Sequence, residues 1–252
     1  MTGAGDILDL LGATGPGLVS IIGGGGKTTL MMAMARAHVA RDHTCVTTTS
    51  TRIREPAPGD TGAVVVGPVD DVLPRALALL RARQHITVAR EREVAEDRVK
   101  LRGFALPCLD RLAGLGYATL VEADGSAGRS LKAHDAWEPA VPSRSRLVIC
   151  VVGADGVGAP LDEEHVHRPA LFAARCGLSA GDATTPEAIA TVLLHPDGPL
   201  RVVSPRARVV VGITKWEAHA AGAATLAGAI RRRAPRLEVV MLPSLPPPAR
   251  AR

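Results

Sequence analysis

The chain has 252 residues, of which 46% are apolar and only 2% aromatic, so its core must consist of aliphatic side chains. Such a composition suits parallel strands that are buried on both faces. The net charge is +5, but many of the arginines gather near residues 231–236 and 250–252 without aromatic neighbours, which argues against nucleic-acid binding.

Other features of the sequence predict a reduced protein of the cytoplasm. The four cysteines lie far apart and form no Cys-x-x-Cys pair. The first twelve residues lack the basic and apolar stretches of a secretory leader. No apolar run approaches the roughly 20 residues that span a bilayer, which argues against a membrane protein.

Strands and helices are expected to alternate along the chain. Apolar and β-branched runs predict strands at residues 18–22, 43–48, 62–66, 85–89, 117–123, 147–152, 209–213 and 237–242. Helical patterns predict helices at residues 6–11, 28–39, 70–83, 107–115, after 169, at 185–194 and at 217–233. Residues 90–103 and 195–208 have no clear pattern.

This alternation predicts an α/β fold with a doubly wound, mostly parallel sheet, of the P-loop NTPase-like type. Its ligand is then expected at the carboxyl ends of the strands. We expect a single domain at residues 1–242, and a Pro- and Arg-rich, disordered tail at residues 243–252.

A glycine loop follows the first predicted strand, with the sequence Gly23-Gly24-Gly25-Gly26-Lys27-Thr28-Thr29. Residues without Cβ let backbone N–H groups close around phosphate oxygens, and the next helix presents its positive end to them. Lys27 is expected to extend into an open loop and reach the phosphates of ATP or GTP, with Thr28 as a ligand of Mg²⁺. The alternative is a flexible glycine turn.

The spacing of this loop departs from the usual one, because Ile21 stands where the first glycine is expected. The loop resembles the Gly-Gly-x-Gly-Lys-Thr-Thr loop of the P-loop NTPases that form dimers. That resemblance implies a homodimer, although the additional lysine of those proteins is replaced by Ile22.

Carboxylates follow two of the predicted strands. Asp124, with Gly125 after it, resembles a Walker B aspartate and is expected to bind Mg²⁺ together with Thr28. Glu122 points to the same side of its strand as Asp124, and Asp155 follows the strand at 147–152. Either Glu122 or Asp155 is a candidate catalytic base, and Asp124 has the alternative role of a turn cap.

The region around Asp124 also resembles one protein family. The matching run is Val121-Glu122-Ala123-Asp124-Gly125-Ser126-Ala127-Gly128-Arg129-Ser130-Leu131-Lys132-Ala133-His134. Shorter matches are Glu138-Pro139, Val141-Pro142, Val152-Gly153-Ala154-Asp155, Gly158, Pro160-Leu161 and Val166-His167-Arg168-Pro169. Together with the glycine loop, these blocks resemble the YqeC-like family of selenium cofactor biosynthesis or selenium-dependent hydroxylase accessory proteins. The resemblance implies a nucleotide-binding accessory factor whose partner is a molybdenum hydroxylase.

Two cations follow the second carboxylate. Arg129 and Lys132 are placed to neutralise the γ-phosphate or a small anionic acceptor, or else they are solvated surface charges. Further along, Asp162 is expected to cap the start of a helix, with a site for zinc or another transition metal at His165 and His167 as the alternative.

Thr214-Lys215-Trp216-Glu217 stands where many GTPases carry Asn-Lys-x-Asp. In that pattern a carboxylate accepts two hydrogen bonds from guanine while the lysine stem covers the ring. Thr in place of Asn and Glu in place of Asp leave the choice between ATP and GTP open. An ordinary strand end with Glu217 in the first turn of a helix is the competing interpretation.

These patterns predict a Mg²⁺-dependent nucleotide triphosphate-binding protein, an NTPase or phosphoryl-transfer enzyme in selenium or molybdenum cofactor maturation. A small-molecule kinase on the same fold is one alternative, and it would need an acceptor pocket near Arg129 and Lys132. A non-hydrolytic, nucleotide-dependent scaffold or switch is the other.

Overall fold

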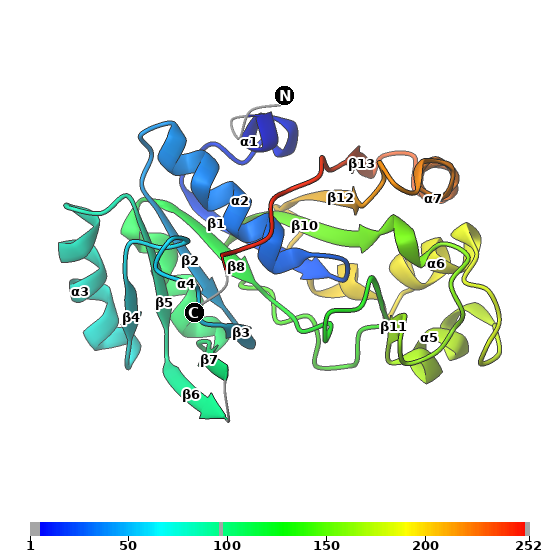
Figure 1. Ribbon diagram of the computed structural model, residues 1–252, viewed down its shortest axis with the longest axis horizontal. Coiled ribbons are helices and arrows are strands. Elements are labelled where there is room, and N and C mark those ends of the chain that lie inside the picture. The colour runs from blue at the N-terminus through cyan, green and yellow to red at the C-terminus, as the bar shows by residue number, and fades with distance from the viewer. Residues whose placement is uncertain (1–5, 96–97, 250–252) are drawn as a thin grey trace.

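The computed structural model describes residues 6–95 and 98–249, built around one central parallel sheet (Figure 1). Its eight strands have the order β13-β12-β10-β1-β8-β2-β5-β4. The predicted doubly wound α/β architecture is therefore confirmed. In chain order the strands are β1 (Gly17–Gly23), β2 (Cys45–Thr49), β4 (Val64–Val66), β5 (His85–Ala89), β8 (Ala118–Glu122), β10 (Ser145–Gly153), β12 (Arg208–Thr214) and β13 (Glu238–Met241).

Helices cover both faces of this sheet. One face carries α1 and α2, and the other carries α3, α4, α6 and α7, with α5 packed on α6. Within the described ranges, no helix has the length and apolar character needed to cross a membrane. The helices are α1 (Asp6–Leu11), α2 (Lys27–Ala40), α3 (Val69–Leu80), α4 (Leu106–Leu112), α5 (Pro169–Cys176), α6 (Pro186–Leu193) and α7 (Ala220–Arg233), with 3-10 turns η1 (Ala113–Leu115), η2 (Ala154–Gly156) and η3 (Pro199–Val202).

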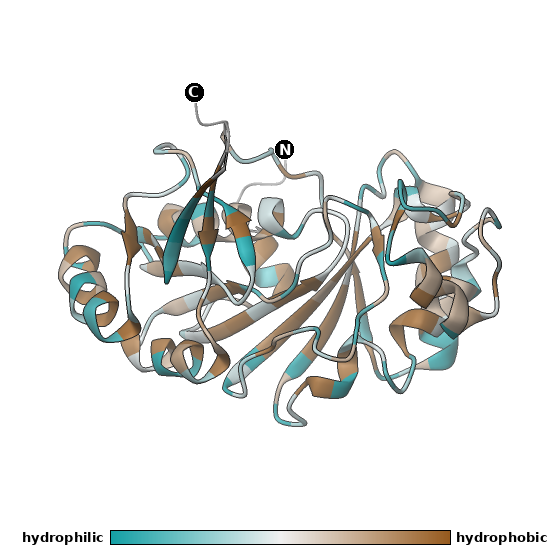
Figure 2. Cartoon of the chain, turned by 90° about the horizontal axis from the view of Figure 1, so that it is seen from below, coloured by the Kyte–Doolittle hydropathy of each residue, from teal (hydrophilic) through white to brown (hydrophobic). Residues whose placement is uncertain are grey.

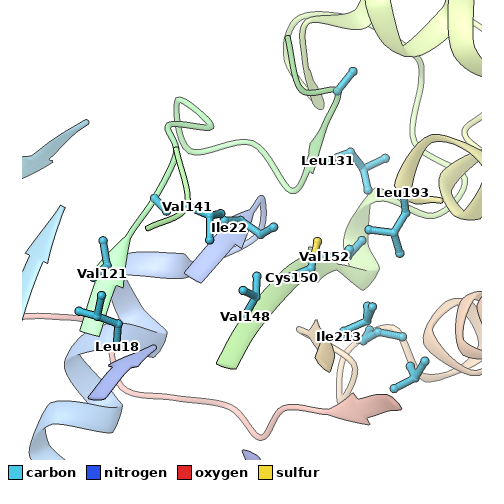
Figure 3. Packing of buried hydrophobic residues seen from close by; sticks show 14 of the residues in the cluster. Leu18, Ile22, Val121, Leu131, Val141, Val148, Cys150, Val152, Leu193 and Ile213 are labelled. Atoms are coloured by element: carbon cyan, nitrogen blue, oxygen red, sulfur yellow. The ribbon is translucent and has the colours of Figure 1, made fainter. Parts of the chain in front are cut away.

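Successive residues of the inner strands point to opposite faces and are buried on both. On β1, Ile21 packs under α1 and α2, whereas its neighbour Ile22 joins the other core cluster. Figure 3 shows Leu18 and Ile22 with Cys150 in that second cluster. Strands buried on both faces read as continuous apolar runs, which is why the sequence located them well. The central strands are accordingly hydrophobic along most of their length in Figure 2.

Two smaller sheets complete the fold. Residues 90–103, which the sequence left unassigned, contain β6 (Glu91–Ala95) and β7 (Arg98–Arg102). These strands pair antiparallel, and β7 also pairs with β3 (Arg52–Arg54). The charged side chains of this hairpin mask any apolar alternation, since only one face of it is buried. Elsewhere, β9 (Leu131–Lys132) pairs with β11 (Val166–His167).

The structure also moves one helix start and describes part of the tail. The predicted helix at 217–233 begins only at Ala220, because residues 216–219 form a turn in which the His219 N–H donates to the Trp216 carbonyl at 3.1 Å. Residues 243–249 form no helix or strand, but Leu245 packs on the core beside α2 and Arg36 Nη2 donates to the Pro246 carbonyl at 3.2 Å. The final three tail residues lie outside the described residues.

Two buried histidines make the stability of the fold depend on pH. Burial lowers the pKa of His38 and of His85 to about 4, whereas the unfolded side chain titrates near about 6.5. Between these values the unfolded chain takes up protons that the folded chain does not, so the fold loses stability as the pH falls through this window.

We therefore expect the free energy of unfolding to fall by about 2 kcal/mol per histidine from pH 7 to pH 5. Urea titrations at the two pH values measure this. His85→Gln should remove its share of the difference, and His219→Gln, at an exposed position, serves as the matched control. An unchanged pH dependence in His85→Gln would contradict the assignment.

Candidate functional site

The glycine loop joins β1 to α2 and is held against the sheet by backbone hydrogen bonds. The Gly24 N–H donates to the Val151 carbonyl and the Gly25 N–H to the Arg129 carbonyl, each at 2.9 Å. A Cβ on Gly25 would lie 2.6 Å from the Gly153 nitrogen, so this close approach requires glycine. Gly26, with φ of 114°, borders open space.

The first turn of α2 presents free backbone donors to that open space. Within the described residues, the N–H groups of Gly26, Lys27, Thr28 and Thr29 have no hydrogen-bond partner in the protein. Unpaired N–H groups at the start of a helix, together with the helix dipole, favour a bound anion. The N–H groups of Gly23 to Gly25 instead bond within the protein and fix the shape of the loop.

Lys27 is buried at 3% exposure, contrary to the expectation that it extends into an open loop. Its Nζ lies 3.2 Å from Asp124 Oδ1 and donates to the Gly23 carbonyl at 2.7 Å and to Ser126 Oγ at 3.1 Å. A buried ammonium group requires a compensating charge. Asp124 supplies that charge to Lys27 in this structure.

Asp124 is fully buried and has further partners on its other oxygen. Asp124 Oδ2 accepts the Gly23 N–H at 2.9 Å and His134 Nε2 at 2.6 Å, and lies 3.3 Å from Lys132 Nζ. Burial opposes ionisation, but Lys27, His134 and Lys132 outweigh it, so the pKa of Asp124 lies well below its usual range. Burial also lowers the pKa of His134. A neutral His134 next to the ionised Asp124 carries its proton on Nε2 and donates a hydrogen bond to that carboxylate.

Lys132 connects this carboxylate to a second one. Its Nζ lies 2.8 Å from Glu138 Oε2 and donates to the Gly125 carbonyl, and Glu138 also bonds Arg168. Burial opposes ionisation of Glu138, but Arg168 and Lys132 overcome it and lower its pKa. The described chain thus places Lys132 in a buried network and not on the surface.

Glu122, at the end of β8, is the carboxylate that contacts Thr28. The Thr28 hydroxyl donates to Glu122 Oε2 at 2.6 Å, so a hydroxyl and a carboxylate oxygen lie together beside the free donors of α2. Burial raises the pKa of Glu122 above its usual range, although Lys27 opposes the change. The sequence predicted that Asp124 would bind Mg²⁺ together with Thr28. In the structure Asp124 instead contacts Lys27 and Lys132.

Asp155 and the segment after β12 form a neighbouring cluster. Asp155 Oδ2 accepts Ser130 Oγ at 2.8 Å and Lys215 Nζ at 2.6 Å. Thr214 Oγ1 donates to the Gly25 carbonyl at 2.7 Å and so fastens this segment to the glycine loop. Glu217 is exposed, and its Oε1 accepts the Ser244 N–H at 2.6 Å.

The remaining candidate residues have structural partners. Arg129 donates to the carbonyls of Glu163 and Ala127 at 2.8 and 2.6 Å. Asp162 accepts backbone N–H groups of Glu164 and His165, but it caps a turn before β11, and no helix starts there. Across residues 6–95 and 98–249, no three His, Cys, Asp or Glu side chains group as a metal site.

Sequence reasoning did not single out His134, Ser126, Ser130 and Glu138. All four lie inside or next to the run that carries the family resemblance, so that run was the available signal. Their roles could not be read from it because most of their partners are distant in the chain: Ser126 bonds Lys27 and Ser130 bonds Lys215.

Asp124→Asn removes the charge that two buried lysines share. We expect the free energy of unfolding to fall by about 3 to 5 kcal/mol, because removing one partner leaves a buried charge uncompensated. Urea unfolding measures this. Asp70→Asn breaks an exposed pair with Arg111 and should cost less than about 1 kcal/mol. Equal effects of the two substitutions would contradict the compensation described above.

Comparison with known proteins agrees with the resemblance seen in the sequence. A family model described as YqeC protein matches residues 19–170. A protein of Escherichia coli (strain K12), with the name Uncharacterized protein YqeC, is 30% identical over 212 residues that cover 83% of this chain and 80% of that protein. The matched family range contains the glycine loop, Glu122, Asp124, His134 and Asp155. The chain belongs to the YqeC family.

Proposed function

We propose that this protein binds a nucleoside triphosphate with Mg²⁺ at the glycine loop and acts as an NTPase in the maturation of molybdenum hydroxylases that carry selenium. One observation carries the nucleotide part. The free N–H groups of Gly26 to Thr29, the Lys27 ammonium and the Thr28–Glu122 pair meet at the carboxyl ends of β1 and β8. Ligands of doubly wound folds bind at such strand ends.

Lys27 changes partner when phosphate binds. A triphosphate brings several negative charges to the start of α2, and these attract the ammonium group away from Asp124. Asp124 is not left alone, because Lys132 and His134 remain on its Oδ2. The network therefore tolerates the loss of Lys27 without leaving a carboxylate buried and unpaired.

The oxygen donors of Thr28 and Glu122 suit Mg²⁺, a hard cation that takes hydroxyl, carboxylate, phosphate and water oxygens. In this proposal Thr28 and Glu122 hold the ion and Asp124 is the counter-ion of Lys27, whereas the sequence pattern assigned the metal to Thr28 and Asp124. Mg²⁺ would offset phosphate charge.

The biological setting is proposed from the family resemblance. It gives a cytoplasmic accessory factor with a molybdenum hydroxylase as partner, and a homodimer through the resemblance of the glycine loop. Product analysis separates hydrolysis from the alternatives. Phosphate release from NTP alone supports an NTPase, and tight binding without turnover supports a scaffold.

Lys27→Ala should lower triphosphate affinity at least tenfold, about 1.4 kcal/mol, because it removes the only cationic side chain in the first turn of α2. Fluorescent-nucleotide titration measures this, with Lys100→Ala, at an exposed position, as the control. Wild-type affinity in Lys27→Ala would rule out the glycine loop as the phosphate site.

Glu122→Gln keeps the shape of the side chain and removes its charge. We expect nucleotide binding to persist while Mg²⁺-dependent phosphate release falls at least tenfold, about 1.4 kcal/mol in the barrier. Glu187→Gln, on the surface of α6, is the matched control. Unchanged turnover would remove Glu122 from the proposed catalytic site.

Guanine is the base that Glu217 suits better. The Ser244 N–H donates to Glu217 Oε1 and orients the carboxylate, whose remaining lone pairs on both oxygens can accept the two donors of the guanine edge. Glu217 is exposed in this structure, so the preference requires the bound base to cover it. Guanine then offers two donors, whereas adenine offers one amino group and leaves the covered carboxylate half satisfied, at a cost of roughly 1 to 3 kcal/mol. We expect unlabelled GTP to compete better than ATP against a labelled nucleotide, and Glu217→Gln to reduce the difference. Equal competition by both nucleotides would show that this segment does not read the base.

A further inference from the structure

A cleft of about 510 Å³ opens near the carboxyl end of β8. It lies at the carboxyl ends of β2, β5 and β8, since Ser50 follows β2, Arg90 follows β5 and Gly125 follows β8. The Ser50 N–H donates to the Glu122 backbone carbonyl at 3.1 Å, so one wall of the cleft adjoins the end of β8, the strand that carries Glu122. The Gly125 carbonyl and Glu138, also in the lining, both bond Lys132.

Three arginines line this cleft, and two of them come from the hairpin region that the sequence left unassigned. Arg52 is on β3, Arg90 precedes β6, and Arg102 is on β7. Each of these side chains is more than half exposed. Guanidinium groups bind carboxylate and phosphate oxygens in a two-pronged geometry, so a cluster of them suits an anionic ligand.

The pairing of the strands puts like charges opposite one another. Arg52 lies directly across from Arg102, and Arg54 across from Lys100, on the exposed face of β3 and β7. Like charges in directly opposite positions destabilise a sheet. Glu91 and Glu93 offset part of the charge, with Arg52 Nε 2.8 Å from Glu93 and Arg102 Nη1 3.5 Å from Glu91. In the cleft itself, Arg52, Arg90 and Arg102 face the two carboxylates Glu91 and Glu93. Glu138, the carboxylate of the lining, is already paired with Lys132 and Arg168, so positive charge remains.

The remaining lining favours a small molecule over a polymer. The cleft volume falls within the range of small-ligand sites, about 300 to 1,000 Å³. Phe104 and Ala105 add an apolar wall, and the Ser50 hydroxyl is buried without a hydrogen-bond partner among the described residues. The one aromatic residue of the lining, Phe104, is only 2% exposed, so it presents no open ring face on which a nucleic-acid base could stack.

We propose that this cleft binds a small organic molecule with at least two carboxylate or phosphate groups. Arg52, Arg90 and Arg102 hold its anionic groups, and Ser50 bonds its polar part. Arg129 and Lys132, the sequence candidates for such contacts, bond other parts of the protein. The assignment of this molecule as second substrate rests on the proposed nucleotide function, because only then does it lie beside a reactive phosphate.

Citrate and fructose 1,6-bisphosphate serve as the carboxylate and phosphate probes in calorimetric titrations without nucleotide. Arg52→Gln/Arg102→Gln should weaken binding of at least one probe by about tenfold or more. Arg233→Gln/Arg236→Gln removes the same charge at exposed positions at the end of α7 and beyond it, and should leave affinity within about twofold. Glu91→Gln should tighten binding, since Glu91 competes for Arg90 and Arg102.

Lys27→Ala separates the cleft from the glycine loop. Probe binding that persists in Lys27→Ala and falls in the cleft variant supports the cleft, even if no nucleotide binds and the proposed function fails. A probe that is lost in Lys27→Ala and kept in the cleft variant occupies the glycine loop, which overturns the cleft and leaves the nucleotide proposal standing. Three other outcomes would also overturn the cleft proposal. They are equal losses of affinity in both arginine double variants, no gain of affinity in Glu91→Gln, and no binding of either probe to the wild-type protein up to about 10 mM.

Discussion

The arrangement of the site depends on one buried carboxylate, Asp124. It balances Lys27 and Lys132, accepts the Gly23 N–H and orients His134, so two stretches of chain, 23–27 and 132–134, meet at its two oxygens. Buried charges are tolerated only when they are paired and hydrogen-bonded. This requirement fixes the end of β8 against the start of α2. It also explains why Glu122, and not Asp124, is directed to Thr28.

Much of the fold could be predicted from the sequence because the sheet is parallel and buried. Continuous aliphatic runs such as that of β10 can only be inner strands in a chain of this length, and alternating helices leave few topologies. The β6–β7 hairpin could not be predicted, because its exposed face is a row of arginine, lysine and glutamate. The additional pairing of β7 with β3 joins residues far apart in the chain, such as Arg52 and Arg102, and no local pattern encodes it.

The candidate site was predictable as a location but not as a set of pairings. Gly23 to Thr29, Glu122 and Asp124 were identified by their positions after strands, which parallel topology brings to one edge of the sheet. Partner choice among them is set by distances of a few ångströms after folding. Glu122 and Asp124 are only two residues apart. The sequence therefore does not indicate which of them contacts Thr28 and which pairs with Lys27.

The backbone bonds of the glycine loop have a consequence for the kinetics of any ligand that binds there. Gly23, Gly24 and Gly25 are each held by a hydrogen bond to a neighbouring segment, and Thr214 holds the Gly25 carbonyl from the opposite side. The loop is therefore preorganised, and a ligand pays little entropy for ordering it. The rearrangement that remains is the motion of one lysine side chain, which takes place in nanoseconds when unhindered and more slowly when an ion pair must break first. Association would then be limited by diffusion and by that exchange of ion pairs, whereas the affinity would carry the cost of separating Lys27 from its carboxylate.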